Sequence, residues 1–246
     1  MKTELARIAR IAKTRSKEQF TSLTHMLNED MLLECHKQLN GNKAIGIDQV
    51  TKEQYEENLA GNIRDLVSRL KRKVYRPQAV RRVYIPKAGS NKKRPLGIPA
   101  YEDKIVQMAI SNILTAIYEA DFIDCSCGFR PQRGAHEAIQ LLEQMLIIKK
   151  VNWIADADIT GFFDHVSHEW MMKFLEARIK DPNFLRLIKK ILKAGYMETG
   201  TKYRTDEGTP QGGVVSPILA NIYLHYALDL WFEKVVKKHF KAKHIW

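Results

Sequence analysis

The sequence predicts an α+β protein, and two features of its pattern carry this prediction. Several segments place apolar residues three and four positions apart, as in residues 102–118, which is typical of helices with a buried face. Other segments are short apolar runs bounded by Gly or Pro, as in 79–85 and 94–99, which is typical of strands. Helices and strands do not alternate regularly along the chain, so we expect a mixed fold without repeated β-α-β units.

The composition favours a folded protein outside the membrane. The chain has 246 residues, of which 45% are hydrophobic, which is enough to bury a core. No apolar run reaches the roughly 18 residues needed to span a bilayer. The first residues lack the apolar stretch of a signal peptide, so we expect a cytoplasmic protein with no membrane partner. Cys35, Cys125 and Cys127 form no C-x-x-C pair and are expected to stay reduced.

The charge distribution predicts a polyanionic partner. The net charge is +12 and the isoelectric point is about 9.5, which favours a polyanionic partner, usually a nucleic acid. Residues 66–101 contain no Asp or Glu, so their basic side chains repel one another unless phosphates neutralise them. A generally basic, soluble protein would also explain the net charge. The residues predicted to bind RNA are Arg69, Lys71, Arg72, Arg81 and Arg82.

The first half of the chain predicts helices followed by a β-hairpin. Residues 1–40 are helical in pattern, and a second helix is expected over 52–70. The strand 79–85 is followed by a turn rich in Gly, Ser and Asn and by the strand 94–99. The prolines of this second strand lack a backbone N–H, so it is expected to lie at a sheet edge.

The second half of the chain predicts mostly helices. The expected elements are a helix over 102–118, a loop at 128–131, a helix over 135–148, a buried strand over 153–159, a helix from Ser167 to about 179, a helix begun by Asp181-Pro182, a hairpin over 196–205 and a long helix over 216–239.

Two aspartates lie close together just before the Gly-Phe-Phe-Asp segment. If 153–159 is a strand, the side chains of Asp156 and Asp158 point to the same face. Neighbouring carboxylates repel one another unless a cation, a proton or strong donors lie nearby. A Mg²⁺ ion with oxygen ligands would meet this need. A solvated strand end with one capping aspartate would explain the pattern equally well.

A glycine-rich stretch covers residues 207–217. It is expected to form a turn that leads into a helix beginning at Ser216-Pro217. Free backbone N–H groups in such a turn can bind a phosphate or a nucleic-acid backbone. Because glycine-rich turns are common, this stretch alone is a weak indication of function.

Together these segments resemble the sequence blocks of group II intron reverse transcriptases. Residues 158–164 (Asp-Ile-Thr-Gly-Phe-Phe-Asp) resemble the family's D-I-K-G-F-F-D block, with Thr160 where Lys is common. Residues 208–217 match its G-T-P-Q-G-G-x-x-S-P block. Further resemblances follow the family's order: A-x-G-x-D-x-x-T at 44–51, the fingers hairpin at 82–99, D-[RK]-x-x-Q at 103–107 and G-F-R-P at 128–131.

The resemblance implies the fingers and an incomplete palm of a right-hand polymerase. It implies that Asp158 is catalytic and binds Mg²⁺, with the backbone carbonyl of Ile159 completing the metal site. The ring of Phe163 is expected to exclude the 2′-hydroxyl of a nucleotide. The implied partners are an intron RNA template, a DNA primer and a dNTP. The other residues implied to bind the nucleotide are Lys87 and Arg94 at the triphosphate, and Gln211 and Gly212 in the pocket.

Several of these residues also have an ordinary structural interpretation. Lys87 and Arg94 would then be solvated charges of the hairpin, and Phe163 would belong to the core. Asp48 is expected to be a turn or cap residue, and Asp164 a helix cap rather than a metal ligand.

We expect three regions: an N-terminal helical extension over 1–60, fingers with a basic hairpin over 61–150 and a partial palm over 151–246. The palm is expected to stop before a Tyr-Ala-Asp-Asp hairpin, whose aspartates complete a two-metal site in the family. This chain alone is therefore expected to be inactive as an RNA-directed DNA polymerase. Its unpaired sheet edge is expected to favour aggregation or a homodimer. The alternative hypothesis is a non-catalytic RNA-binding splicing (maturase) module.

Overall fold

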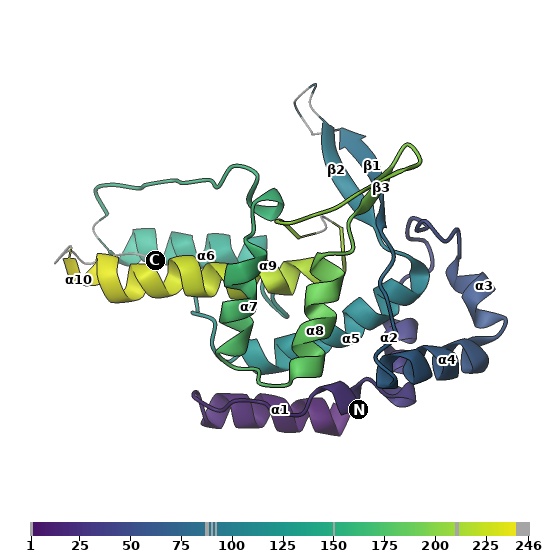
Figure 1. Ribbon diagram of the computed structural model, residues 1–246. Coiled ribbons are helices and arrows are strands. Elements are labelled where there is room, and N and C mark those ends of the chain that lie inside the picture. The colour runs from purple at the N-terminus through teal and green to yellow at the C-terminus, as the bar shows by residue number, and fades with distance from the viewer. Residues whose placement is uncertain are drawn as a thin grey trace.

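A buried helix, α5 (Tyr101–Tyr118), runs through the middle of the computed structural model (Figure 1), which describes residues 2–86, 89, 91, 93–149, 151–209 and 212–239. The predicted helical pattern is confirmed, and Ile105, Ile110 and Ile113 have no exposed surface. Helices α1 (Lys2–Thr14) and α2 (Glu29–Gln38) pack against it. Because neighbours cover α5 on several sides, apolar residues occupy most of its circumference.

The prediction of helices over 1–40 is confirmed for α1 and α2 but wrong for residues 15–23, which are not helical. The expected helix over 52–70 is two helices. After the short turn η1 (Thr24–Met26) and α2 come α3 (Lys52–Glu56) and α4 (Leu59–Lys71). The prediction of one continuous helix is wrong at Asn58, whose backbone leaves the helical region with φ −133° and ψ 43°. The side chain of Asn62 then donates to the carbonyl of Tyr55 at 3.0 Å, which fixes the bend.

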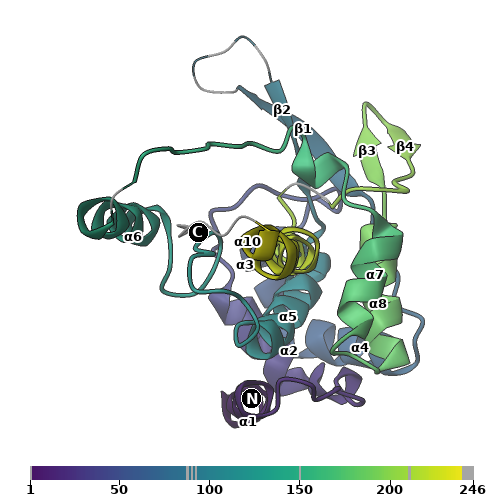
Figure 2. The same cartoon turned by 90° about the vertical axis from the view of Figure 1, so that its left-hand side faces the viewer.

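A four-stranded sheet stands above the helices in the order β2-β1-β3-β4. The predicted hairpins are confirmed as β1 (Val80–Pro86) with β2 (Lys93–Ile98), and β3 (Tyr196–Glu198) with β4 (Thr201–Tyr203). As predicted, the proline-containing strand β2 lies at an edge. Strands β1 and β3 pair in parallel, which joins two parts of the chain that are far apart in sequence (Figure 2).

Residues 44–48 connect the N-terminal helices to the hairpin and to α5. The carbonyl of Ile45 accepts two hydrogen bonds from the Arg81 guanidinium, at 3.0 and 2.5 Å. The carboxylate of Asp48 accepts a hydrogen bond from the backbone N–H of Tyr101 at 2.7 Å. The expectation that Asp48 is a turn or cap residue is therefore confirmed.

The second half of the chain is mostly helical. Two predicted caps are confirmed, because the side chain of Ser167 accepts from Trp170 N at 3.4 Å and that of Asp181 accepts from Asn183 N at 3.0 Å. The helices are α6 (Ala135–Ile148), η2 (Phe162–Asp164), α7 (His168–Glu176), α8 (Pro182–Leu192) and α9 (Ser216–Leu224), which continues through the π-helical turns η3 (His225–Asp229) and η4 (Phe232–Val236) to α10 (Lys237–His239).

Asp181 also ties the N-terminal segment to α8. Its second carboxylate oxygen accepts hydrogen bonds from the backbone N–H groups of Leu23 and Thr24, both at 2.8 Å. Burial alone would raise the pKa of this carboxyl group, but the hydrogen bonds from Leu23, Thr24 and Phe184 outweigh burial and lower the pKa.

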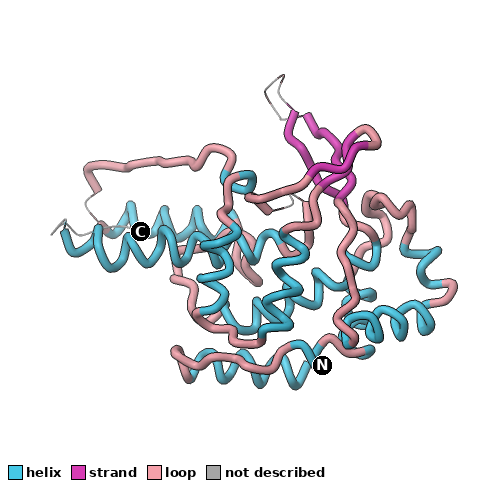
Figure 3. The backbone as a smooth tube through the Cα atoms, in the orientation of Figure 1, coloured by secondary structure: helices cyan, strands magenta, loops and turns pink. Residues whose placement is uncertain are grey.

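The predicted buried strand over 153–159 is wrong. These residues form an extended loop between α6 and η2 (Figure 3). Trp153 is 92% exposed and Ile154 is 70% exposed. A strand requires a neighbour that pairs with its backbone N–H and C=O groups, and no described strand lies beside this segment. The apolar residues alone therefore do not make it a strand.

One hydrophobic core joins the three predicted regions. Ile8, Ile63, Ile110, Leu175 and Ile222 belong to the same buried cluster. The division at residues 60 and 150 stays a prediction, and the regions share their core. Within the described part of the chain, no helix combines the length and the apolar character that crossing a membrane requires.

Candidate functional site

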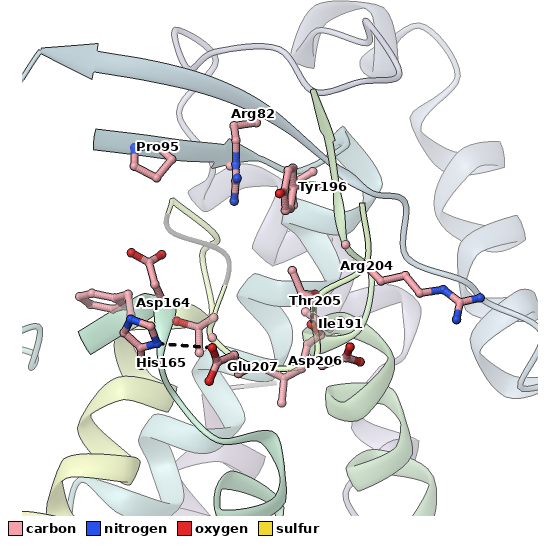
Figure 4. A pocket seen from close by; sticks show the side chains of 17 residues that line it. Arg82, Pro95, Asp164, His165, Ile191, Tyr196, Arg204, Thr205, Asp206 and Glu207 are labelled. Atoms are coloured by element: carbon pink, nitrogen blue, oxygen red, sulfur yellow. Dashed lines mark hydrogen bonds and ion pairs between the residues drawn. The ribbon is translucent and has the colours of Figure 1, made fainter. Parts of the chain in front are cut away.

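A cavity of about 470 Å³ separates the sheet from the loops below it. Side chains of β1, β2 and β3 line its upper wall, and η2 together with residues 204–209 lines its lower wall. Figure 4 shows Arg82, Pro95 and Tyr196 above, and His165 and Glu207 below. The two sequence blocks that carry the family resemblance thus contribute to one cavity.

Hydrogen bonds hold these two blocks together at the lower wall. The N–H of Thr209 donates to the carbonyl of Phe163 at 2.8 Å, and the N–H of Gly208 donates to the carbonyl of Val166 at 2.8 Å. The ring Nε2 of His168 donates to the carbonyl of Gly208 at 2.7 Å. The start of the glycine-rich stretch, at Gly208 and Thr209, is therefore hydrogen-bonded to the turn that contains Phe163 and to the residues that follow it.

Gly208 has to be glycine at this junction. Its φ is +83°, and a Cβ would lie 2.8 Å from the Asp164 carbonyl oxygen and 3.0 Å from that of Phe163. Both the backbone conformation and the close approach exclude a side chain. The hydroxyl of the next residue, Thr209, is buried without a hydrogen-bond partner among the described residues.

Phe163 is half-buried and lines the cavity, beside a second, exposed phenylalanine. The rings of Phe163 and Phe129 meet edge to face, with centroids 6.4 Å apart. Phe129 is 67% exposed and has a φ of +55°, which is uncommon for a residue other than glycine. The role of Phe163 as a gate against the 2′-hydroxyl stays a prediction.

Buried polar side chains fix the loop that carries Phe129. The guanidinium of Arg130 binds Glu119 at 2.7 Å and donates to the carbonyl of Ile123 at 2.7 Å. The side-chain amide of Asn221 donates to the carbonyl of Gly128 at 2.8 Å. The Gly-Phe-Arg-Pro segment is thus held against α9, and Phe129 is presented toward Phe163.

Asp158 and Ile159 lie outside the cavity lining. Both belong to the exposed loop, where Ile159 is 51% exposed. Because the strand over 153–159 is absent, the argument that Asp156 and Asp158 share a strand face is wrong. The catalytic and metal-binding roles of Asp158 and Ile159 stay predictions.

The described residues do not by themselves form a metal site. Asp158 offers carboxylate oxygens and Ile159 a carbonyl oxygen, which are ligand types that Mg²⁺ prefers. However, no group of three or more His, Cys, Asp or Glu side chains comes together in the described part of the chain to hold a metal. The two residues therefore fit Mg²⁺ only as part of a larger ligand set.

The hairpin places Arg94 on the face opposite the cavity. In the antiparallel register Arg94 pairs with Ile85 and Leu96 with Val83, whereas Arg82 pairs with Gly97. Directly paired residues share a face and neighbours alternate. Arg94 is exposed on the Leu96 face, and Arg82 lies on the cavity face.

Gly212 approaches strand β2 closely. Its φ is +95°, and a Cβ there would lie 2.6 Å from Leu96 Cδ1 and 2.9 Å from the Gly97 carbonyl oxygen. The glycine-rich loop therefore lies against the hairpin. Lys87 and Gln211, the other residues predicted to bind the nucleotide, lie outside the described residues.

The residues predicted to bind RNA divide into two groups. The guanidinium of Arg69 binds both oxygens of Glu102 at 2.8 Å, and that of Arg81 binds the Ile45 carbonyl. These two arginines therefore stabilise the fold, and an RNA contact by either stays a prediction. Lys71 and Arg72 at the end of α4 are exposed, and Arg82 faces the cavity.

Sequence reasoning missed the aromatic residues of the second hairpin. The Arg82 guanidinium carbon lies 3.3 Å from the centroid of the Tyr196 ring. Tyr196 in turn stacks on Tyr203, with centroids 5.0 Å apart. Once 196–205 is predicted as a hairpin around Gly200, the two tyrosines are candidates for a cross-strand pair. Contact with Arg82 depends on the β1–β3 pairing, which no local pattern indicates.

Comparisons with known proteins agree with these features. The family model described as reverse transcriptase (RNA-dependent DNA polymerase) matches residues 85–244. The chain is 39% identical over 229 residues to group II intron-encoded protein LtrA of Lactococcus lactis subsp. cremoris, covering 92% of this chain and 38% of LtrA. It is 41% identical over 183 residues to protein YkfC of Escherichia coli (strain K12), covering 73% of this chain and 48% of YkfC.

Two more distant similarities concern a plant protein and a solved structure. Nuclear intron maturase 1, mitochondrial, of Arabidopsis thaliana is 32% identical over 95 residues, which are 39% of this chain and 13% of that protein. A partial Cas6-RT-Cas1--Cas2 complex is similar in fold, with a TM-score of 0.50 at 20% identity, covering 86% of this chain and 34% of that one. The chain spans less than half the length of each of these curated relatives.

Proposed function

Because this chain belongs to the reverse transcriptase (RNA-dependent DNA polymerase) family, we propose that it forms the fingers and part of the palm of a group II intron reverse transcriptase. The observation that carries the proposal is the junction at the lower wall of the cavity. There the turn of Phe163 and the glycine-rich stretch at Gly208 and Thr209, which are far apart in sequence, are joined by hydrogen bonds. The substrates we propose are an intron RNA template, a DNA primer and dNTPs.

The proposed nucleotide contacts come from the hairpin, the glycine-rich stretch and the turn of Phe163. Arg94 and Gly212 bind the nucleotide on the Leu96 side of β2, and the family resemblance adds Lys87 and Gln211 to the proposed nucleotide-binding residues. Phe163 gates the sugar. Cationic side chains that contact the triphosphate stabilise the negative charge that develops on the phosphate oxygens during phosphoryl transfer.

Members of this family generally use divalent metal ions. We propose Mg²⁺, held by the Asp158 carboxylate and the Ile159 carbonyl. Mg²⁺ prefers an octahedral set of oxygen atoms, so these two ligands need others to complete the site. A bound Mg²⁺ would supply charge neutralisation at the phosphates.

A second candidate function is a non-catalytic RNA-binding module that assists splicing. It is favoured by the exposed cations Lys71 and Arg72 at the end of α4. It predicts RNA binding without DNA synthesis. A homodimer stays a prediction under either function, and the molar mass from light scattering tests it.

Salt-dependent binding to an RNA template annealed to a DNA primer tests the nucleic-acid contact that both functions require. We expect the logarithm of the binding constant to fall steeply with the logarithm of salt concentration. Replacing Lys71 and Arg72 by Gln should reduce the slope by about 1.4–1.8, because each phosphate contact contributes about 0.7–0.9. Replacing Lys13 and Lys173, exposed lysines of α1 and α7, is the matched control. An unchanged slope in the first variant would remove Lys71 and Arg72 from the RNA interface.

A further inference from the structure

One face of the four-stranded sheet presents stacked side chains to the cavity. Tyr196 and Tyr203 are directly opposite each other on β3 and β4, and Arg82 lies on the neighbouring strand β1. Arg82 and Tyr196 line the cavity, and Figure 4 shows their side chains next to each other above its lower wall. The proposed polymerase chemistry does not use this row of side chains.

The three side chains form a column. The Tyr196 and Tyr203 rings are nearly parallel, at 15°, with centroids 5.0 Å apart. The Arg82 guanidinium lies over the Tyr196 ring at 3.3 Å. Because β3 lies between β1 and β4 in the sheet, Arg82 and Tyr203 flank Tyr196 from opposite sides. The column therefore ends at the face of the guanidinium turned away from Tyr196, on the side where Figure 4 shows Pro95.

Arg82 is held in place before any ligand binds. Its guanidinium lies 3.9 Å from one oxygen of Glu198, and the other oxygen accepts a hydrogen bond from the Tyr84 hydroxyl at 2.6 Å. Its side chain is only 24% exposed. Stacking of a ligand on this guanidinium would therefore cost little conformational entropy of the Arg82 side chain.

The lower wall favours a base over a phosphate. Asp164, Asp206 and Glu207 line it together with Arg204, whose side chain points away from these carboxylates in Figure 4, and His165 lies 3.4 Å from Glu207. A row of carboxylates repels phosphate, whereas carboxylate oxygens accept hydrogen bonds from the amino groups of bases. Arginine planes and aromatic rings are the surfaces on which proteins stack unpaired bases. The volume of about 470 Å³ lies within the range of about 300–1,000 Å³ typical of small-molecule sites.

The cavity and the proposed triphosphate contact of Arg94 lie on different faces of the hairpin. Arg94 and Leu96 lie on the opposite face of the hairpin from Arg82, and Gly212 approaches Leu96. A base in the cavity and a nucleotide at Arg94 would therefore contact different faces of β1 and β2. Phe163, the proposed gate at the sugar of that nucleotide, also lines the cavity, so the two sites would meet at its ring.

We propose that the cavity binds one unpaired nucleobase of the RNA strand, stacked on the Arg82 guanidinium with its amino group directed toward Glu207. This inference rests on the proposed function, because the RNA strand is the template. Cytosine, adenine and guanine carry an amino group and uracil carries none, so uracil binds less tightly. Arg82 then contacts a base, in contrast to the phosphate contact predicted from the sequence.

The test is equilibrium binding of this chain to a DNA primer annealed to an RNA template with a short single-stranded overhang. Each overhang nucleotide is replaced in turn by an abasic one. At one position, removal of the base should weaken binding roughly tenfold, and cytosine should bind more tightly than uracil there. Because each ratio compares two ligands of the same protein sample, an inactive fraction of the protein does not change it.

Variants of Arg82 separate stacking from charge. In both Arg82→Gln and Arg82→Lys, the ratio of the binding constants for the intact and the abasic overhang should fall to about 1. Lysine keeps the positive charge but lacks the planar guanidinium group on which a base stacks. A tenfold ratio retained by Arg82→Lys would overturn the stacking assignment. Trp170→Leu, which removes an exposed ring with Lys173 placed 4.4 Å from its centroid on α7, should keep the full ratio.

The remaining outcomes show whether the bound base comes from the RNA strand or from a free nucleotide. They also separate failure of this inference from failure of the proposed function. Cytidine monophosphate at micromolar concentration should not abolish the difference in affinity between the intact and the abasic overhang. If it does abolish this difference, the cavity binds free nucleotides and the assignment to the RNA strand is overturned. A chain that binds the primer–template with no base-dependent difference at any overhang position would overturn this inference and leave the proposed function standing. A chain that does not bind the primer–template would overturn both.

Discussion

The ring Nε2 of His168 donates a hydrogen bond of 2.7 Å to the carbonyl oxygen of Gly208. His168 is only 6% exposed, at the first turn of α7. Gly208 lies at the start of the glycine-rich stretch and packs on the turn of Phe163. This contact makes α7 a support for both sequence blocks at the cavity.

His168→Ala should lower the free energy of unfolding by about 2 kcal/mol, because the Gly208 carbonyl loses a buried partner. Chemical denaturation measures this change. His136→Ala, on the exposed surface of α6, is the control and should change stability by no more than about 0.5 kcal/mol. Equal effects of the two substitutions would contradict a supporting role for His168.

Gly208→Ala and Gly200→Ala separate backbone strain from crowding. Both glycines have nearly the same φ, +83° and +82°, but an added Cβ meets nothing within 4 Å at Gly200. We expect Gly200→Ala to cost about 1 kcal/mol from the left-handed backbone. Gly208→Ala should cost about 2 kcal/mol more because its Cβ collides with backbone carbonyls. Similar unfolding midpoints for the two variants would show that the junction at Gly208 is loose.

Asp181→Ala should destabilise the protein more than loss of a helix cap explains. Ser167→Ala removes the cap of α7 and should cost about 1 kcal/mol. Asp181→Ala also leaves the N–H groups of Leu23 and Thr24 without their partner, so we expect about 3 kcal/mol in total. Thermal unfolding of the two variants compares them. If both lose the same stability, the tether to the N-terminal segment contributes nothing.

Asp103 should make stability fall with rising pH. Burial raises the pKa of its carboxyl group to about 6, although hydrogen bonds from the Tyr75 hydroxyl and the Gln78 N–H act to lower it. Since the unfolded-state pKa is near 3.8, the folded state binds this proton more tightly. The contribution is complete below about pH 4 and is lost as pH rises through about 6, a change of about 3 kcal/mol.

Asp103→Asn isolates this effect. The pH dependence of its unfolding free energy, subtracted from that of the wild type, should show the loss between about pH 4 and about pH 6.5. A difference that does not vary with pH would mean that Asp103 titrates normally in the folded protein.

Local patterns were sufficient to predict most of the fold. The apolar spacing in α5 gave a helix, the Gly200 turn gave the β3–β4 hairpin, and Asp181-Pro182 gave a helix start. The prediction failed at 153–159 because strand formation depends on a paired neighbour, which the segment's own apolar residues do not specify. It also missed the break at Asn58, next to which the side chain of Asn62 donates a hydrogen bond to the Tyr55 carbonyl.

The candidate site was predictable only in part. The blocks around Phe163 and Gly208 could be singled out by motif, and the structure brings them together. The contact between Arg82 and Tyr196 could not be predicted from a motif. It joins strands that are more than a hundred residues apart, and it depends on the order of the strands in the sheet. Likewise, basic composition did not reveal that Arg69 and Arg81 bind protein oxygens instead of solvent.

The most direct test of the proposed function is dNTP incorporation onto a DNA primer annealed to an RNA template, with Mg²⁺, by the natural protein that carries these residues. We expect RNA-templated synthesis that falls at least about 100-fold in Asp158→Ala, through loss of charge stabilisation. It should persist in Asp156→Ala, to which the family resemblance assigns no role. A wild-type protein that binds the primer–template without incorporating nucleotides, or an Asp158→Ala variant with undiminished synthesis, would contradict the proposed function.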